Sequence, residues 1–452
     1  MSGAFFEDLL SAIAERGRAL LDGDRRRGGG EDLGGLAERL LSGQGEASGV
    51  ALARELLDAY EAADETGKAG FLALLAARFG PDAGRLDAAI AGYRQAPSDA
   101  TALALHAAAE ARRQELIRRL NLAPGGTAAL VAMRAFLLDR LKAQPELGAV
   151  DSDFHHLLSS WFNRGFLVMQ RIDWNMRATV LEKIIRYEAV HAIRDWDDLR
   201  RRIDPADRRC YGFFHPALVD EPLIFVEVAL TQGMPDAIAP ILAAERTPLA
   251  AGAADTAAFY SISNCQAGLA GVSFGNFLIK QVVEELHRDL PHLQTFVTLS
   301  PAPGFTRWLR AAAADMEEPE AGEKTEVAEG SLTAEERDAI AALDDPAWPD
   351  DPDRAAALRD RLLPLAARYF LHAKTRGEPL DPVARFHLGN GARLERLNWL
   401  GDRSAKGLRQ AAGLMVNYRY VLPDIEKNHE AYATKQKVVA ASGVTRLAKS
   451  RS

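Results

Sequence analysis

The chain has 452 residues, of which 48% are hydrophobic and 26% charged, and its formal net charge is −8. This length exceeds what one domain normally needs, so we expect two domains of ordinary globular composition. The acidic balance argues against a dedicated nucleic-acid surface, and no run approaches the ~20 apolar residues of a membrane-spanning helix. Cys210 and Cys265 form neither a metal-ligand cluster nor a disulfide framework, and Met1–Leu21 is unlike a secretory signal, so we expect a cytoplasmic protein.

Residues 1–187 are rich in Ala, Leu, Arg and Glu, and we predict that they form successive helices. Breaks at Gly80-Pro81 and Pro124-Gly125-Gly126 separate them. One helix is expected to begin after Ser98, whose side chain can cap the first turn. We interpret this part as an all-helical domain that packs on itself or on a second copy of the chain.

Residues 188–452 have a different pattern, in which short β-branched and aromatic runs alternate with amphipathic segments. Strand-like runs are Pro222–Leu230, Thr256–Ile262 and Leu293–Leu299. A glycine-rich loop and a helical stripe from Leu278 to Leu286 lie between the last two. Strand, loop, helix and strand in this order form a βαβ unit, which indicates a mixed α/β domain. The predicted class is therefore α+β.

Four further elements follow in this second domain. Residues 316–353 are acidic and contain proline, and we interpret them as an insertion that includes a short helix starting with a capping box at Thr333 and Glu336. Helices are expected over residues 354–375 and 404–415. Ala384–Leu388 is expected to be a strand edge.

The loop at residues 264–276, NCQAGLAGVSFGN, allows two functional interpretations. Gly271–Gly275 reads G-x-S-x-G, the nucleophile elbow of serine hydrolases with Ser273 as nucleophile, but the preceding residues are too polar and glycine-rich for the required central strand. Alternatively, backbone N–H groups at the start of the helix bind phosphates. NTPase and dinucleotide signatures are absent from the sequence, which favours the pyrophosphate of coenzyme A. Glycines that merely allow tight packing of a helix on a sheet would leave the same pattern.

Several long motifs of the C-terminal half together resemble the malonyl-CoA decarboxylase family. The N-terminal half is similar to the family in its helical character alone. The motifs are RRCYGFFHP (208–216) with EPLIFVEVAL (221–230), NCQAGLAGVSFGNFLIK (264–280), HLQTFVTLSPAPGFTRWL (292–309), FHLGNGARLERLNWLGDRSAKGL (386–408) and GLMVNYRY (413–420).

The resemblance implies a helical N-terminal domain that mediates oligomer formation and a C-terminal domain like the GCN5-type N-acetyltransferases. It also implies conversion of malonyl-CoA to acetyl-CoA and CO2 without a metal or organic cofactor. The expected partners are malonyl-CoA, acetyl-CoA and further copies of the chain in a dimer or tetramer, with no nucleic acid and no membrane. Three alternatives stay open: a CoA-dependent acyltransferase on the same fold, a serine hydrolase using Ser273, and a helical scaffold with an inactive CoA domain.

Loss of CO2 from a malonyl thioester leaves an enolate, which needs oxyanion stabilisation and a proton donor such as histidine. Of the ten histidines, His387 stands in the FHL-x-NGA motif, and Ser300 stands in the LSP-x-PGF motif. The resemblance implies that Ser300 and His387 are the catalytic pair, with Asn390 placed to orient His387 or the substrate. By their residue context alone, Ser300 could instead cap the helix that follows, and His387 could be a structural histidine at a strand end.

The remaining expected substrate-binding residues fall into two groups. Backbone N–H groups of the loop are expected to contact the CoA phosphates and the thioester region, and two tyrosines and an arginine of the last motif either line the site or serve the fold. Ser273 stands where the family resemblance leads us to expect a glutamate, so no carboxylate is implied there. The residues are Ala270, Gly271, Val272, Ser273, Phe274, Gly275 and Asn276, and Tyr418, Arg419 and Tyr420.

Overall fold

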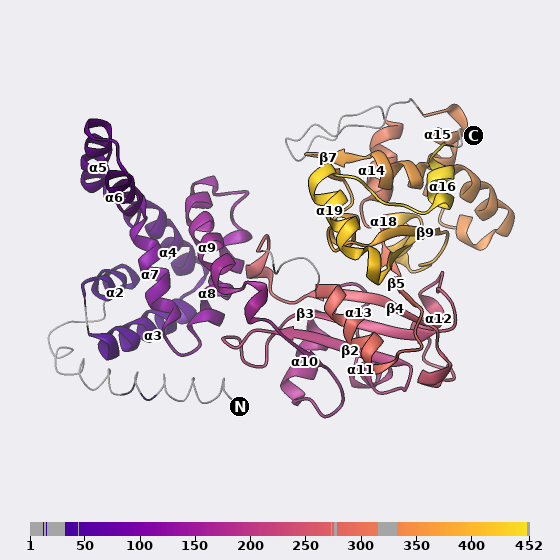
Figure 1. Ribbon diagram of the computed structural model, residues 1–452, viewed down its shortest axis with the longest axis horizontal. Helices are drawn as coiled ribbons and strands as arrows, with labels where there is room; N and C mark the ends of the chain where they lie inside the picture. The colour runs from indigo at the N-terminus through magenta and orange to yellow at the C-terminus, as the bar shows by residue number, and fades with distance from the viewer. Residues whose placement is uncertain are drawn as a thin grey trace. The chain divides into compact units, whose positions relative to one another are not determined.

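The computed structural model describes residues 32–43, 45–272, 274, 278–314 and 332–449, together with Ala12 and Glu15. The chain divides into two compact units, drawn with their elements in Figure 1. The helical unit comprises Met1–Met169, Phe213–Ile224 and Asn264–Phe274, and the sheet unit comprises Gln170–Gly212, Phe225–Ser263 and Gly275–Ser452. Residues 170–187, assigned to the helical domain from the sequence, thus group with the sheet.

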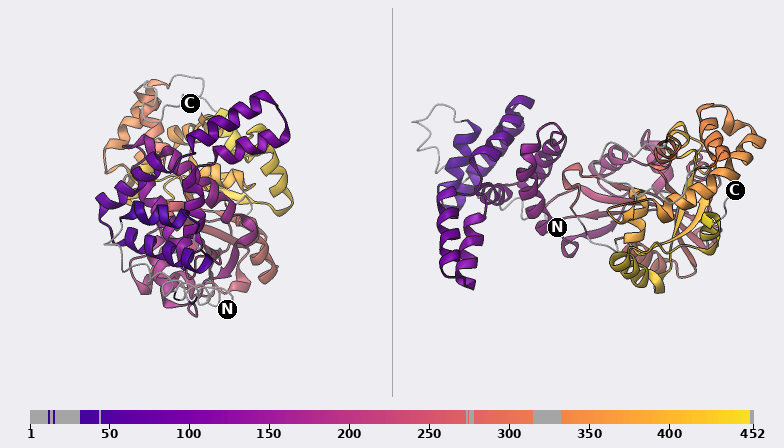
Figure 2. Two further views of the ribbon diagram at one scale, coloured as in Figure 1. Left: turned by 90° about the vertical axis from the view of Figure 1, so that its left-hand side faces the viewer. Right: turned by 90° about the horizontal axis from the view of Figure 1, so that it is seen from above.

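The helical unit is built from short helices, several of which begin at a capping side chain. Asp32, Asp64, Asp82 and Ser98 each accept a backbone N–H bond from the first turn that follows, so the predicted cap at Ser98 is confirmed. Such a cap stabilises a helix by about 1 kcal/mol. The helices include α2 (Leu33–Leu41), α3 (Glu46–Ala62), α4 (Glu65–Arg78), α5 (Ala83–Gln95), α6 (Asp99–Ala109), α7 (Arg112–Asn121), α8 (Gly126–Leu138) and α9 (Gly148–Trp161). Helices α5 and α6 pack on each other as a hairpin, which both views of Figure 2 show in indigo and purple.

The sheet unit is organised around one mixed sheet with the strand order β1-β2-β3-β4-β5-β10-β6, in which β9 also pairs with β10. Strands β4 and β5 are parallel, whereas β10 is antiparallel to β5, β6 and β9. The strands are β1 (Val168–Arg171), β2 (Arg208–Phe214), β3 (Pro222–Thr231), β4 (Thr256–Asn264), β5 (Thr295–Thr298), β6 (Ser300–Pro301), β9 (Arg393–Asn398) and β10 (Met415–Tyr420), and a separate pair is formed by β7 (Lys374–Thr375) and β8 (Glu378–Pro379).

Helices lie between these strands along the chain and after the last of them. They include α10 (Ala178–Tyr187), α11 (Trp196–Ile203), α12 (Ala239–Leu242), α13 (Leu278–Asp289), α14 (Phe305–Ala313), α15 (Ala334–Ala341), α16 (Pro352–His372), α17 (Pro382–Gly389), α18 (Ala405–Ala411), α19 (Ile425–Lys435) and α20 (Ser442–Lys449). The predicted order, with helices first and a mixed α/β region second, is confirmed. Within the described part of the chain, no helix is long and apolar enough to cross a membrane.

Most of the local predictions for the second half hold. The three strand-like runs correspond to β3, β4 and β5, the apolar stripe corresponds to α13, and the capping box of Thr333 and Glu336 begins α15. Residues 315–331, which fall within the predicted insertion, lie outside the described residues. In the described part of the predicted insertion, the side chains of Ile340 and Trp348 are buried.

Three local predictions are wrong, each for an identifiable reason. Residues 384–388 are not a strand edge but part of α17, because Asp381 caps a helix whose first residue is Pro382. The helix predicted over 404–415 ends at Ala411, since Ala412 and Gly413 both adopt positive φ and turn the chain into β10. Val168–Arg171 is a strand inside the part predicted to be helical, and its pairing with β2 outweighs the local helical pattern.

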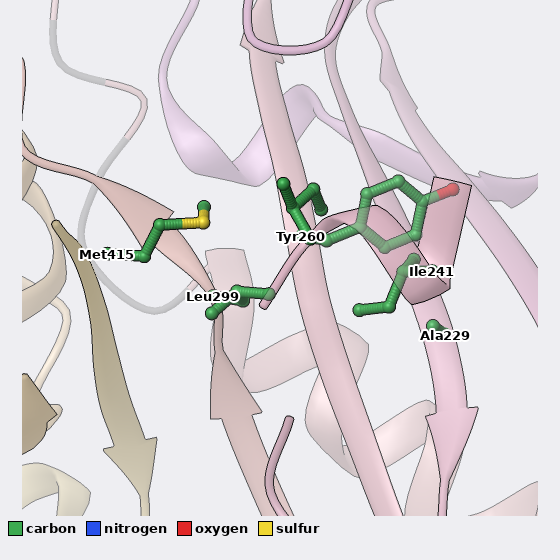
Figure 3. Packing of buried hydrophobic residues seen from close by; sticks show 6 residues of the cluster. Ala229, Ile241, Tyr260, Leu299 and Met415 are labelled. Atoms are coloured by element: carbon green, nitrogen blue, oxygen red, sulfur yellow. The ribbon is translucent and has the colours of Figure 1, made fainter. Parts of the chain in front are cut away.

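The residues packed on one face of the central strands show which residues point to the opposite face of the sheet. Leu299, between β5 and β6, packs in a cluster with Tyr260 of β4 and Met415 of β10, as Figure 3 shows. Ala229 of β3 and Ile241 of α12 complete the labelled group. Side chains alternate along a strand, so burying Leu299 directs its neighbours Thr298 and Ser300 to the opposite face.

Candidate active site

Ser300 occupies the first position of β6, at the place where the chain leaves the sheet. It pairs with Val416 of β10, and the next residue, Pro301, pairs with Met415. Ser300 exposes 6% of its surface. Helix α14 begins at Phe305 and has Gly304 as its N-cap, so the interpretation of Ser300 as the cap of this helix is wrong.

His387 reaches Ser300 from α17. Asp381 accepts the N–H of Ala384 at 2.9 Å, which starts the helix and sets the position of His387 about one and a half turns later. The His387 Nε2 atom lies 3.1 Å from Ser300 Oγ. Since His387 exposes 2% of its surface, the two side chains form a contact from which water is largely excluded. The structure therefore brings together the two residues predicted to be the catalytic pair.

Two tyrosines of β10 hold the imidazole from other sides. The Tyr420 hydroxyl lies 2.9 Å from His387 Nδ1, and the Tyr418 ring stacks on the imidazole with centroids 4.7 Å apart and an interplanar angle of 26°. Tyr418 and Tyr420 are two residues apart, so they share the face of β10 that Val416 and its partner Ser300 also use. Both were predicted either to line the site or to serve the fold, and both contact His387.

The hydrogen bonds of the pair define the proton positions. Ser300 Oγ donates to Thr298 Oγ1 at 2.9 Å, and Thr298 Oγ1 also accepts the Tyr418 N–H at 3.1 Å. A serine hydroxyl carries one proton, so this arrangement makes His387 Nε2–H the donor to Ser300. Nδ1 of the same neutral imidazole then accepts from the Tyr420 hydroxyl. The result is a directed chain of donors from Tyr420 through His387 and Ser300 to Thr298.

Burial sets the protonation state of this chain. It lowers the pKa of the His387 imidazole from 6.5 to about 3, because a charged ring loses hydration that its surroundings do not replace. Burial also raises the pKa of the Tyr420 hydroxyl well above its ordinary value. At neutral pH the imidazole is therefore neutral and the phenol keeps its proton, as the donor chain requires.

We expect the His387 imidazole to stay neutral down to about pH 5 in the folded protein. The unfolded chain, with an ordinary pKa near 6.5, takes up this proton first as the pH falls. The contribution of His387 to stability is thus fully present above about pH 6.5 and is lost toward pH 3. Histidine-selective 13C NMR, with the peak assigned by its loss in His387→Gln, measures this directly. A titration midpoint between pH 6 and 7 would contradict the buried, neutral imidazole.

Asn390 and Arg419 were also predicted to act at the site. Asn390 is the C-cap of α17, where its side-chain amide donates to the Phe386 carbonyl at 2.8 Å and its backbone N–H donates to the His387 carbonyl at 3.2 Å. Its role in orienting His387 or the substrate stays a prediction. Arg419 lies on the face of β10 opposite to its two tyrosine neighbours, and its guanidinium is 3.8 Å from Glu395. Sequence reasoning missed Thr298, although the alternation of polar and apolar residues in Thr298-Leu299-Ser300 gives the signal.

The glycine-rich loop belongs to the helical unit and packs on α8. The buried Arg134 guanidinium donates to the carbonyls of Gly268 and Ala270 at 2.8 and 2.9 Å. A Cβ atom on Gly268 would overlap the Val131 carbonyl, so glycine is required here for close packing. Gly271 has φ +77°, and its carbonyl lies 3.1 Å from His155 Nε2. At least one glycine of the loop therefore serves packing.

The loop also uses two of the N–H groups that were predicted to bind phosphate. The N–H of Ala270 donates to Ala267 and that of Val272 donates to Leu269, both at 3.0 Å. These two donors close turns within the loop, which narrows the predicted phosphate contacts to the amides of the other residues. Phe274 is half-buried, and Ser273, Gly275 and Asn276 lie outside the described residues.

Comparisons with known proteins agree with the motifs. Residues 79–162 match the model of the malonyl-CoA decarboxylase N-terminal domain, and residues 165–452 match that of the malonyl-CoA decarboxylase C-terminal domain. The mitochondrial malonyl-CoA decarboxylase of Rattus norvegicus is 36% identical over 412 residues, which are 85% of this chain and 82% of that protein. That of Anser anser anser is 39% identical over 349 residues, or 74% and 68%.

Solved structures lead to the same family. The crystal structure of malonyl-CoA decarboxylase from Rhodopseudomonas palustris is 62% identical with a TM-score of 0.86, and the match covers 92% of this chain and 98% of that one. The structure from Agrobacterium vitis is 57% identical with a TM-score of 0.85, covering 93% and 100%. On these matches, and on the motifs that carry Ser300 and His387, the chain belongs to the malonyl-CoA decarboxylase family.

Proposed function

We propose that this chain is a malonyl-CoA decarboxylase, a carboxy-lyase that converts malonyl-CoA to acetyl-CoA and CO2. The observation that carries the proposal is the 3.1 Å contact between Ser300 Oγ and His387 Nε2, inside two motifs that resemble the family. Relatives at up to 62% identity are named for this activity. Membership in the family indicates malonyl-CoA as the substrate, and the geometry supports Ser300 and His387 as the side chains that act on it.

The reaction breaks the bond between the α-carbon and the carboxylate and leaves its electron pair on the thioester as an enolate. In our proposal, the Ser300 hydroxyl turns from Thr298 and donates its hydrogen bond to the malonyl carboxylate before that group departs. The Ser300–His387 pair then supplies the proton that the α-carbon takes up. A proton from water restores the pair. One malonyl-CoA and one proton thus give one acetyl-CoA and one CO2, and the pair is unchanged.

The burial of the pair contributes to the rate. Charge that is localised on the malonyl carboxylate spreads over the enolate as neutral CO2 leaves, and water stabilises the localised charge more than the spread one. With Ser300 and His387 exposing 6% and 2% of their surfaces, little water is present to favour the reactant. The fixed donors at the site replace that water, which is how a preorganised site lowers such a barrier.

Incubation with malonyl-CoA alone, in a buffer containing EDTA, tests this function. We expect CO2 and acetyl-CoA in equal amounts, and in D2O one deuterium in each acetyl methyl group. An acyltransferase would need an acceptor, and a hydrolase would release malonate and free coenzyme A. Either result would overturn the proposal. Activity in EDTA also tests the expectation that neither metal nor organic cofactor takes part.

We further propose that the loop held by Arg134 contributes to binding of the CoA portion. Arg134→Met removes both bonds to the loop carbonyls, so we expect KM for malonyl-CoA to rise by ~10-fold while kcat changes by less than ~3-fold. Arg140→Met is the matched control, because Arg140 bonds the Phe136 carbonyl and Glu65 instead. An unchanged KM in the Arg134 variant would show that the loop does not contribute to binding of the CoA portion. The homo-oligomer and the cytoplasmic location remain predictions.

A further inference from the structure

A single tyrosine of α16 contacts both chain segments that carry the proposed pair. The Tyr369 hydroxyl donates to Asp381 Oδ2 at 3.3 Å, and Asp381 is the N-cap of α17, the helix of His387. Both Tyr369 and Asp381 are buried. Burial raises the pKa of the Asp381 carboxyl to about 6, so this carboxyl lies in surroundings where each hydrogen-bond donor counts.

The same hydroxyl limits the turn that follows Ser300. A Cβ atom on Gly304 would lie 2.6 Å from the Tyr369 hydroxyl oxygen, closer than side-chain carbons approach other atoms, and the next nearest Tyr369 atom would be 3.8 Å away. Gly304 has φ −95°, which any residue can adopt, so space and not backbone conformation requires glycine here. The Tyr369 ring packs on Phe305 and Trp308 of α14, with centroids 5.6 and 5.2 Å apart.

We infer that Tyr369 is a positioning residue, whose hydroxyl sets the distance between Ser300 and His387 by supporting the Gly304 turn on one side and the Asp381 cap on the other. This inference rests on the proposed function. Without the hydroxyl, Asp381 loses a donor and a gap opens beside Gly304, and both segments can relax. A change of about 1 Å in such a contact can cost ~100-fold in rate.

The test combines Tyr369→Phe, Gly304→Ala and the double variant. Tyr369→Phe is expected to lower kcat by ~10-fold with KM within ~2-fold, because the pair is displaced while substrate binding is not. Gly304→Ala is expected to lose more, ~100-fold in kcat, because its methyl group collides with the hydroxyl. The double variant removes that collision, so its kcat should exceed that of Gly304→Ala by ~10-fold. Two additive losses would instead place it below both single variants.

Tyr211→Phe is the matched control, since Tyr211 is another buried tyrosine of the sheet unit, in β2. It should keep kcat within ~2-fold. The thermal unfolding midpoints of the same variants test the inference independently of activity. Gly304→Ala should unfold at a lower temperature than the double variant. Should Gly304→Ala not fold, a folded and active double variant supports the inference in the same way.

The possible results distinguish a failure of the inference about Tyr369 from a failure of the proposed function. A Tyr369→Phe variant as active as the Tyr211→Phe control would overturn the inference while the function stands, and so would a double variant no better than Gly304→Ala. A wild type that releases no CO2 from malonyl-CoA would overturn the proposed function and, with it, the catalytic part of the inference.

Discussion

Replacing Ser300 with alanine is expected to lower kcat by ~100-fold or more, with KM for malonyl-CoA within ~3-fold of the wild type. The hydroxyl contacts His387 Nε2 at 3.1 Å and donates to Thr298 Oγ1 at 2.9 Å. Alanine removes these contacts but leaves the backbone pairing of β6 with β10. The loss should therefore fall on the chemical step, which steady-state measurement of CO2 release separates from binding.

Ser263→Ala is a control for the loss of a buried hydroxyl as such. Ser263 is buried in β4, and its hydroxyl bonds the Glu188 carboxylate instead of the pair. We expect kcat of this variant to stay within ~2-fold of the wild type. Near-normal turnover of Ser300→Ala, or an equal loss in both variants, would show that the Ser300 hydroxyl is not part of the reaction.

Replacing His387 with glutamine is expected to be at least as damaging, lowering kcat by ~100-fold or more. The amide is similar in size, so the buried site stays filled. It does not reproduce a ring whose Nε2 meets Ser300 and whose Nδ1 meets the Tyr420 hydroxyl at 2.9 Å. His372→Gln, in the last turn of α16, is the control and should keep its activity.

The two substitutions should not add. When groups act as a unit, removing any one of them causes the full loss of activity. The kcat of the Ser300→Ala/His387→Gln double variant should therefore lie within ~3-fold of that of the less active single variant. A double variant that loses the product of both factors, ~10⁴-fold or more, would mean that the residues act independently. The 3.1 Å contact would then carry no mechanistic meaning.

The sequence predicts the elements of the fold better than their ends. The β-branched and aromatic runs specify β3, β4 and β5, and the Leu278–Leu286 stripe specifies α13, because the spacing of the apolar residues and the length of each segment indicate the same type of element. The error at 384–388 arose from a five-residue pattern, whereas Asp381-Pro382 just before it is a helix-start signal. Val168–Arg171 is too short to be recognised alone, and its strand exists through pairing with β2.

The site follows from the sequence only in part. Ser300 and His387 are 87 residues apart, and nothing in their spacing predicts contact, so the pairing came from motif resemblance. Motif membership does not say which face of a strand a residue uses. The motif therefore groups Arg419 with Tyr418 and Tyr420, although alternation along β10 places Arg419 on the other face.

Glycine loops and buried supports are harder still to interpret from sequence. Gly268 looks like any other glycine of the loop at residues 264–276, yet its requirement comes from the carbonyl of Val131, which lies far earlier in the chain. Gly304 is explained by the hydroxyl of Tyr369 in the same way. Such contacts depend on tertiary packing, which local pattern does not encode.

A crystal structure with a malonyl-CoA analogue that cannot lose its carboxylate would test the central claim most directly. Our account predicts the carboxylate within hydrogen-bond distance, about 3 Å, of Ser300 Oγ, with the α-carbon facing the Ser300–His387 pair. An acyl group bound elsewhere, with neither side chain near its carboxylate or α-carbon, would contradict it.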